Sequence, residues 1–284
     1  MLNKIKDLIA QIPLPMFQNR PPVVAILPLE GVIGSGSRFS SGLNLAGVED
    51  KIKQAFEVGN VKAVALAVNS PGGSPVQSEL IMRRIQRLSE EKDIPVYAFA
   101  EDVAASGGYL ISLAAKEIYA HEASIVGSIG VISAGFGFHK AIEKVGVERR
   151  VYAAGDNKSV LDPFQPEKEN DVKLLKEMQK DIHEFFKNLV KESRGDRLKG
   201  TQKVMFSGQF WAGKEALKLG LIDGVGDIHG VMKEKLGEKT KFKRIKDEKG
   251  FIKGLLGMRG DKSRISDEIL ATLETRSVWS RYGL

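Results

Sequence analysis

The sequence contains no cysteine among its 284 residues. Disulfide frameworks, thiolate nucleophiles and cysteine-ligated zinc sites are therefore excluded. The sequence also has no apolar run of the ~18 residues that a membrane-spanning helix needs, and its start lacks the continuous apolar stretch of a secretion signal. We therefore expect a cytoplasmic protein. With 42% hydrophobic and 28% charged residues, the composition excludes a disordered or collagen-like polymer.

Charge is distributed unevenly along the chain. There are 43 Lys and Arg against 36 Asp and Glu, and residues 232–264 carry twelve of the basic and five of the acidic residues. That segment accounts for the whole net charge of +7. Because acidic residues interleave with the basic ones and few aromatic residues accompany them, a solvated surface is the simplest interpretation. The pattern argues against a nucleic-acid binder and allows at most a peripheral, salt-reversible membrane contact.

The chain divides into three parts. Residues 1–21 are expected to form a short amphipathic helix and a proline-broken linker, which docks on its own protein, on a partner subunit or on a membrane surface. Residues 22–231 contain no clean linker and are expected to form one domain of catalytic size. Residues 232–284 form a basic C-terminal extension, either a tail or an oligomerisation arm.

The first half of the central part alternates between two patterns. Apolar runs at 23–29, 61–69 and 94–100 predict strands, and the apolar spacing of 48–56 and 80–88 predicts helices between them, with a further helix from about residue 106. Strand and helix alternating at this spacing predict βαβ units with a parallel sheet, and therefore an α/β fold.

The second half of the central part is less regular. Short strand-like pieces are expected at 117–133 and 147–154, with a helix at 139–144 between them. A long helix is expected over about 167–192, followed by a turn and a short helix within 206–227. The long helix places six apolar residues on one face: Val172, Leu175, Met178, Ile182, Phe185 and Leu189.

Two strand-to-helix junctions carry glycine pairs. One is Gly72-Gly73 and the other is Gly107-Gly108, directly after Ser106. Adjacent parallel strands would bring both junctions to the carboxyl edge of the sheet, where α/β folds bind ligands. Two backbone N–H groups that converge there would form an oxyanion hole, with Ser106 as a candidate nucleophile. The alternatives are tight turns and a serine that merely caps its helix.

A serine nucleophile needs a base, and the four histidines are poor candidates. His121 ends a strand, His183 lies within the long helix, and neither these nor His139 and His229 have a compelling acidic partner. The other route is a desolvated lysine, because burial in apolar surroundings favours the neutral amine. Local sequence does not single out one lysine among so many.

Six stretches follow one another between Pro22 and about Val231: VVAILPLEGVIG, NSPGGSPVQSE, AEDVAASGGYLIS, IVGSIGV, AAGDNKSVLDPF and FSGQFWAGKEALKLGLID. In this order they resemble the signal peptide peptidase A family, serine peptidases with a Ser/Lys dyad on the Clp-protease and crotonase-like fold. The single copy of the motif set is similar to the short form of the family. The resemblance implies an α/β fold of parallel βαβ units with helical appendages.

The same resemblance implies the roles of individual residues. Ser106 would be the nucleophile, Lys158 the general base, and Ser128 a hydroxyl that helps to hold the lysine amine. The backbone N–H groups of Gly73 and Gly107 would stabilise the oxyanion. No metal or cofactor is implied. The implied substrates are unfolded peptides or signal-peptide remnants, and the implied assembly is a homo-oligomeric ring in which Lys158 acts on its own subunit or on a neighbour. Family members usually begin with a membrane-spanning segment, which this sequence lacks.

Two other functions share this fold. A crotonase-like acyl-CoA hydratase or isomerase would use the same oxyanion hole, but such enzymes use carboxylates and have no nucleophilic serine at the helix start. A catalytically inactive oligomeric scaffold would be favoured only without the dyad. The presence of both Ser106 and Lys158 therefore favours the serine peptidase.

Overall fold

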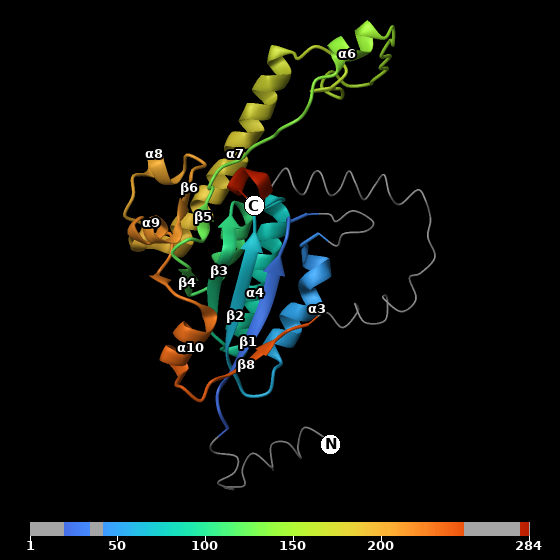
Figure 1. Ribbon diagram of the computed structural model, residues 1–284. Coiled ribbons are helices and arrows are strands. Elements are labelled where there is room, and N and C mark those ends of the chain that lie inside the picture. Colours follow the sequence, from blue (N-terminus) through green and yellow to red (C-terminus); the bar gives the residue numbers. More distant parts are fainter. Residues whose placement is uncertain (1–19, 35–41, 247–278, 284) are drawn as a thin grey trace, which may run out of the picture.

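A computed structural model of the chain describes residues 20–34, 42–246 and 279–283 (Figure 1). The helix expected within residues 1–21 lies outside these ranges, as does most of the basic extension. Among the described residues, no helix combines the length and the apolar character needed to cross a membrane.

The described chain is built on one mixed sheet. Its central strands are β1 (Val23–Glu30), β2 (Val61–Ser70) and β3 (Val96–Ala105), which pair in parallel. The sheet has the order β6-β5-β3-β2-β1-β8, with β4 paired to β3 and β7. Within it only the β5–β6 pair is antiparallel. The parallel βαβ architecture predicted from the alternating pattern is thus confirmed.

Helices cover one face of the sheet. These are α3 (Leu45–Phe56), α4 (Pro75–Lys92) and α5 (Gly107–Ser112). Their buried side chains pack with Leu27 and Leu66 in the main hydrophobic core. The other face is covered in its lower part by α10 (Ile228–Leu236), whose Val231 and Met232 pack on Ile26 and Phe99. A strand buried on both faces requires a nearly uninterrupted apolar sequence, and residues 63–68 within the run 61–69 supply it.

The remaining elements surround this layer: β4 (Glu117–Ala120), β5 (Ile125–Gly127), η1 (Gly195–Arg197), α8 (Gln202–Met205), β6 (Phe210–Ala212), α9 (Gly213–Lys218), β7 (Gly224–Val225), β8 (Lys241–Arg244) and η2 (Ser280–Tyr282). The helix α10 runs through residue 231, and β8 pairs with β1 beyond it. The division of the chain at residue 231 stays a prediction.

The long helix α7 (Glu169–Arg194) differs from its predicted pattern. Of the six apolar residues expected on its packed face, only Leu189 is buried, and Met178 is 52% exposed. The cause is visible in Figure 1: only the C-terminal part of α7 lies against the body, and the N-terminal part projects away from it.

The segment 131–168, which includes α6 (His139–Lys144), leaves the body after β5 and runs alongside α7 to its outer end (Figure 1). We call this segment the arm. The strand expected over 147–154 is wrong, because these residues form no strand and are exposed. A strand needs a neighbour that satisfies its backbone groups, and the arm offers none there.

Candidate active site

Ser106 lies at the sharp turn between β3 and α5. Its backbone has φ 51° and ψ −120°, in the left-handed half of conformational space that non-glycine residues seldom adopt. The Ser106 N–H donates to the Gly127 carbonyl at 2.8 Å, and the Ser106 carbonyl accepts from Leu110 N–H at 3.0 Å. The hydroxyl makes no capping hydrogen bond. Ser106 is the N-cap residue of α5, but its side chain does not cap the helix, so the strained turn leaves the hydroxyl available for another role.

The two glycine turns meet beside Ser106. A Cβ placed on Gly72 would lie 2.6 Å from the Ser106 Cβ, and one placed on Gly107 would lie 3.3 Å from the Gly73 nitrogen. Only glycine permits this approach of two backbones. Neither the Gly73 nor the Gly107 N–H donates to an acceptor within the described part of the chain. Two free donors close to a serine hydroxyl are the arrangement that an oxyanion hole requires.

Ser128 lies beside Ser106 because of the strand register. Ala105 pairs with Gly127 in the β3–β5 ladder, and the next residue of each strand is the serine. Ser128 is 6% exposed, and its N–H donates to the Gln209 carbonyl at 2.8 Å. Its hydroxyl lies 3.4 Å from the Tyr282 hydroxyl. A buried hydroxyl at this position can hold a second polar group next to the serine nucleophile.

These residues share one cavity, which we call the nucleophile cavity. Its volume is about 530 Å³, and Ser106, Ser128, Gly73 and Gly107 all line it. Apolar side chains of α5 and α7, among them Leu110 and Phe186, form part of its wall. The structure thus brings together four of the five site residues that the sequence predicted.

Lys158, the fifth predicted residue, does not line this cavity. It is exposed and lies in the arm, in the turn region between α6 and α7. In the single chain the arm extends away from the sheet that carries Ser106 (Figure 1). Its lysine amine therefore does not complete the site of its own chain in this conformation.

One histidine does line the nucleophile cavity. His183 projects from α7, and its Nε2 lies 3.1 Å from the Ile129 carbonyl. His121 and His229 line a different cavity, and His139 lies in α6. In the described part of the chain, no group of three or more His, Asp or Glu side chains has the arrangement of a metal site.

Sequence reasoning missed the contribution of the C-terminal segment. Arg281 lines the nucleophile cavity, and the Tyr282 hydroxyl lies 3.3 Å from the Pro71 carbonyl. The Tyr282 ring meets that of Phe210 edge to face at 5.2 Å. Two aromatic residues, Trp279 and Tyr282, close to the end of a basic tail were the available signal, because aromatic residues pack where they can be buried.

Comparisons with known proteins agree with this geometry. The model of peptidase family S49 matches residues 89–241, which include Ser106, Ser128 and Lys158. A protein of Enterococcus faecium named after signal peptide peptidase SppA is 31% identical over 262 residues, which cover 87% of this chain and 76% of that protein. Protease 4 of Haemophilus influenzae is 31% identical over 74% of this chain and 34% of its own length.

One longer relative is named as an antiporter and not as a peptidase. The Na(+)/H(+) antiporter NhaA of Brucella abortus is 45% identical over 272 residues, which cover 92% of this chain and 37% of that protein. The chain therefore spans 37% of the length of this relative.

Two solved structures share the fold. They are two mutants of the membrane-bound stomatin-specific protease 1510-N, with TM-scores of 0.52 and 0.51 and 16% identity. They cover 81% and 84% of this chain and 100% and 99% of their own chains. The predicted Clp-protease and crotonase-like fold class and the predicted serine-peptidase family are confirmed, and the acyl-CoA hydratase alternative is not favoured. On the family match, on the Enterococcus faecium relative and on the serine at the strained turn, this chain belongs to peptidase family S49.

Proposed function

We propose that this chain is a serine endopeptidase in which Ser106 attacks a peptide carbonyl and Lys158 of a neighbouring copy is the general base. The observation that carries the proposal is the Ser106 turn, where an uncapped hydroxyl faces two free backbone N–H groups in one cavity. The fold alone would allow other chemistry, so the proposal depends on this site.

The proposed reaction proceeds by acyl transfer. The neutral lysine amine takes the Ser106 hydroxyl proton while Oγ forms a bond to the peptide carbonyl carbon. The Gly73 and Gly107 N–H groups stabilise the resulting oxyanion. The protonated lysine then gives its proton to the leaving amine as the C–N bond breaks, and water hydrolyses the acyl-enzyme by the same steps.

Ser128 is proposed to position the lysine amine. Its buried hydroxyl follows the β5 strand in register with Ser106, so an amine that hydrogen bonds to Ser128 also lies next to the nucleophile. The Tyr282 hydroxyl is the present neighbour of this oxygen, at 3.4 Å. Tyr282 therefore competes with the amine for the same position.

Exposed apolar residues of the arm favour the proposal that the lysine comes from a second copy of the chain. The arm exposes Phe136 (81%), Val145 (72%) and Tyr152 (92%), and α6 buries none of its residues. Monomeric proteins seldom expose such apolar residues together, and a homo-oligomer would cover them. We propose a ring in which the arm of each copy reaches the nucleophile cavity of the next.

The proposed substrates are unfolded peptides, including signal-peptide remnants. A cavity of about 530 Å³ with apolar walls accommodates one or two side chains of an extended chain. One of the two related 1510-N mutants was solved with a substrate peptide. For this chain, the peptide is the class of substrate that the oxyanion site and the serine nucleophile would act on.

Complementation tests this proposal. Ser106→Ala and Lys158→Ala variants are each expected to be inactive on peptide substrates, and Lys140→Ala, another exposed lysine of the arm, is expected to be active. If the two inactive variants are unfolded together and reassembled in equal amounts, about a quarter of the sites combine an intact serine with an intact lysine from a neighbour. Roughly a quarter of wild-type activity is then expected.

Three results would contradict the proposal. A mixture without activity, from variants that still assemble, would mean that the lysine acts within its own chain. An active Lys158→Ala variant with an inactive His183→Ala variant would make His183 the base. A fluorophosphonate probe that labels wild type and Ser106→Ala equally would remove Ser106 as the nucleophile.

We also propose a cytoplasmic location with at most peripheral membrane contact, supported by the basic segment 232–264. Cell fractionation followed by a high-salt wash tests it. Protein that stays with the membranes after salt and carbonate washes would show a different mode of attachment.

A further inference from the structure

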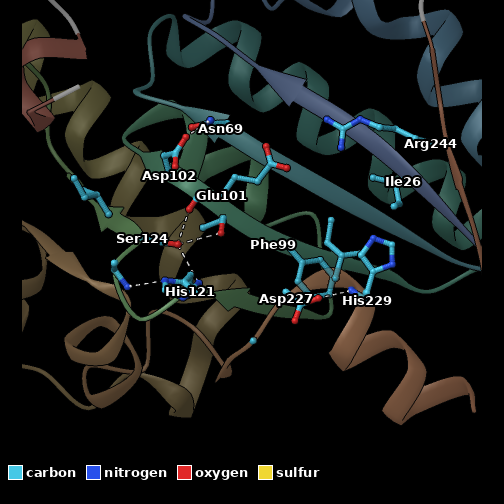
Figure 2. Close-up of a pocket in the computed structure, with 15 residues that line it drawn as sticks. Ile26, Asn69, Phe99, Glu101, Asp102, His121, Ser124, Asp227, His229 and Arg244 are labelled. Atoms are coloured by element: carbon cyan, nitrogen blue, oxygen red, sulfur yellow. Dashed lines mark hydrogen bonds between the residues drawn. The ribbon is translucent and has the colours of Figure 1, made fainter. Parts of the chain in front are cut away.

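A second cavity, of about 630 Å³, opens on the sheet face that carries α10 (Figure 2). Along β3, Phe99, Glu101, Val103 and Ala105 point to this face in alternation. Phe99 packs with α10 residues, whereas Val103 and Ala105 pack under Tyr282. Glu101 lies between these two covered regions and lines the cavity. We call this space the acidic cavity.

A β-bulge presents two carboxylates to the acidic cavity. Val68 pairs with Ala100 and Ser70 pairs with Ala104, so β3 has two more residues than β2 at this point. The Asn69 side chain supports the bulge: its Nδ2 donates to Asp102 Oδ2 at 2.8 Å, and its Oδ1 accepts from Val103 N–H at 3.2 Å. Bulges re-aim side chains and occur often beside functional sites.

In the described part of the chain, neither Glu101 nor Asp102 forms an ion pair, although Arg244 and Asp227 also line the acidic cavity. Among the described residues, no donor or cation forms a hydrogen bond or ion pair with the Glu101 carboxylate. Burial raises the pKa of Glu101, the Arg244 charge opposes this rise, and the Glu30 and Asp102 charges add to it. Arg244 already forms an ion pair with Glu30 at 2.7 Å. A ligand with a cationic group would satisfy both Glu101 and Asp102.

The rest of the cavity suits an aliphatic chain. Phe99, Ile26, Ile125 and Ile228 contribute apolar atoms to its walls. In Figure 2 Glu101, Asp102 and Arg244 lie on one side of the space, and His121, Asp227 and His229 lie on the other. A cavity with apolar walls and carboxylates at one side matches a lysine or arginine side chain, which has an apolar stem and a charged head.

The acidic cavity lies close to the nucleophile cavity along the same two strands. Asp102 and Ser106 are four residues apart in and after β3, and Ile125 and Ser128 are three apart in and after β5. A fully extended chain at ~3.3 Å per residue would make these separations about 10 to 13 Å, and the bulge and the Ser106 turn shorten them. An extended peptide covers that distance with about three or four residues.

We propose that the acidic cavity binds a lysine or arginine side chain of the peptide substrate, about three or four residues from the bond that Ser106 cleaves. The proposal rests on the proposed function, because it assigns a specificity site to the same reaction. It makes Glu101 and Asp102 specificity-determining residues that do not touch the reacting atoms.

Kinetics on matched peptides test the proposal. The cleavage site of an uncharged peptide is first located by mass spectrometry, and lysine or glutamine is then placed at each position three to five residues away on either side. At one of these positions, lysine is expected to lower KM about five- to tenfold relative to glutamine, with kcat unchanged, as for a charge-assisted contact in a half-buried site. Glu101→Gln with Asp102→Asn should remove this preference, and Glu91→Gln, an exposed acid of α4, should keep it.

Charge reversal gives a second readout. Glu101→Lys should shift the preference from lysine to glutamate at the same position. Equal KM values for lysine and glutamine at every position, or an unchanged preference in the Glu101→Gln/Asp102→Asn variant, would overturn the proposal. If wild type cleaves neither peptide, the proposed function has failed instead. Fluorescence anisotropy with the Ser106→Ala chain then measures the lysine preference as binding alone, and equal affinity for both peptides overturns the acidic cavity's role.

Discussion

The base of α7 is attached to the body through Arg194, whose side chain is 1% exposed. Its Nη1 and Nη2 donate to the two Asp223 oxygens at 2.7 and 3.0 Å, and its Nε donates to the Gly220 carbonyl at 3.0 Å. Asp223 also accepts from the Ile118 N–H at 2.8 Å. This network joins α7 to β4 and to the turn before β7.

We predict that Arg194→Met lowers the free energy of unfolding by about 3 kcal/mol. Removing one partner of a buried pair costs about 3 to 5 kcal/mol, because a charge is left buried without compensation. The lower end applies here, since Asp223 is 16% exposed and keeps Arg197 at 3.3 Å. Replacing both partners, as in Arg194→Met with Asp223→Asn, should recover about 1 to 2 kcal/mol of this loss.

The loss should also depend on pH. Burial alone would raise the pKa of Asp223, but the hydrogen bonds from Arg194 and from the Ile118 N–H outweigh it and hold the pKa below its ordinary value of 3.8. A lowered carboxyl pKa stabilises the fold fully above that ordinary value, and the contribution disappears as the pH falls through the folded-state pKa. The difference between wild type and Arg194→Met should therefore be largest near neutral pH and shrink in acid.

Urea denaturation at one fixed protein concentration measures this prediction, because assembly shifts apparent stability. The fluorescence of the two tryptophans, Trp211 and Trp279, reports unfolding. A loss below about 1 kcal/mol at pH 7, or an equal loss in the double variant, would refute the argument that a buried charge is left uncompensated.

Two further predictions concern the nucleophile cavity and its support. Gly73→Ala should lower kcat at least about 100-fold, because a Cβ would lie 1.9 Å from the Ile33 carbonyl oxygen and displace a proposed oxyanion donor. A Cβ on Gly59 meets no atom within 4 Å, so the control variant Gly59→Ala should keep the wild-type kcat. Equal kcat values for the two variants would contradict this prediction. Tyr109→Phe should cost about 1 to 2 kcal/mol of stability, because the buried Tyr109 hydroxyl donates to the Leu221 carbonyl at 2.7 Å. Equal urea midpoints for wild type and Tyr109→Phe would show that the Leu221 carbonyl accepts a hydrogen bond from another donor in the variant.

The sequence predicted best where one physical requirement dominates. The strands at 23–29 and 61–69 were predictable because a strand buried on both faces is apolar along its buried part, here residues 24–27 and 63–68. Ser106 was predictable as a nucleophile candidate because glycine pairs at strand ends indicate close backbone approach. In each case the signal is local, and it does not depend on what another segment does.

Predictions failed where distant contacts decide the structure. The expected strand at 94–100 continues to Ala105 through Glu101 and Asp102, which have low strand propensity, because Asn69 and β5 support this bulged portion. The apolar spacing around Met178 indicates a packed helix face, but that part of α7 extends beyond the body. The position of Lys158 relative to Ser106 depends on the arm and, in our proposal, on a second chain. It therefore cannot be predicted from the sequence around either residue.

The helix α7 also sets a length. Its 26 residues span about 39 Å at 1.5 Å of rise per residue. One end is held by Arg194, and the other carries the arm with Lys158. In the proposed ring the length of α7 determines the distance between neighbouring subunits. Inserting one helical turn into the exposed part of α7 would leave each chain folded. It would, however, move the Lys158 amine about 5 Å past Ser106 of the next copy. The length of α7 can therefore change only together with the curvature of the ring.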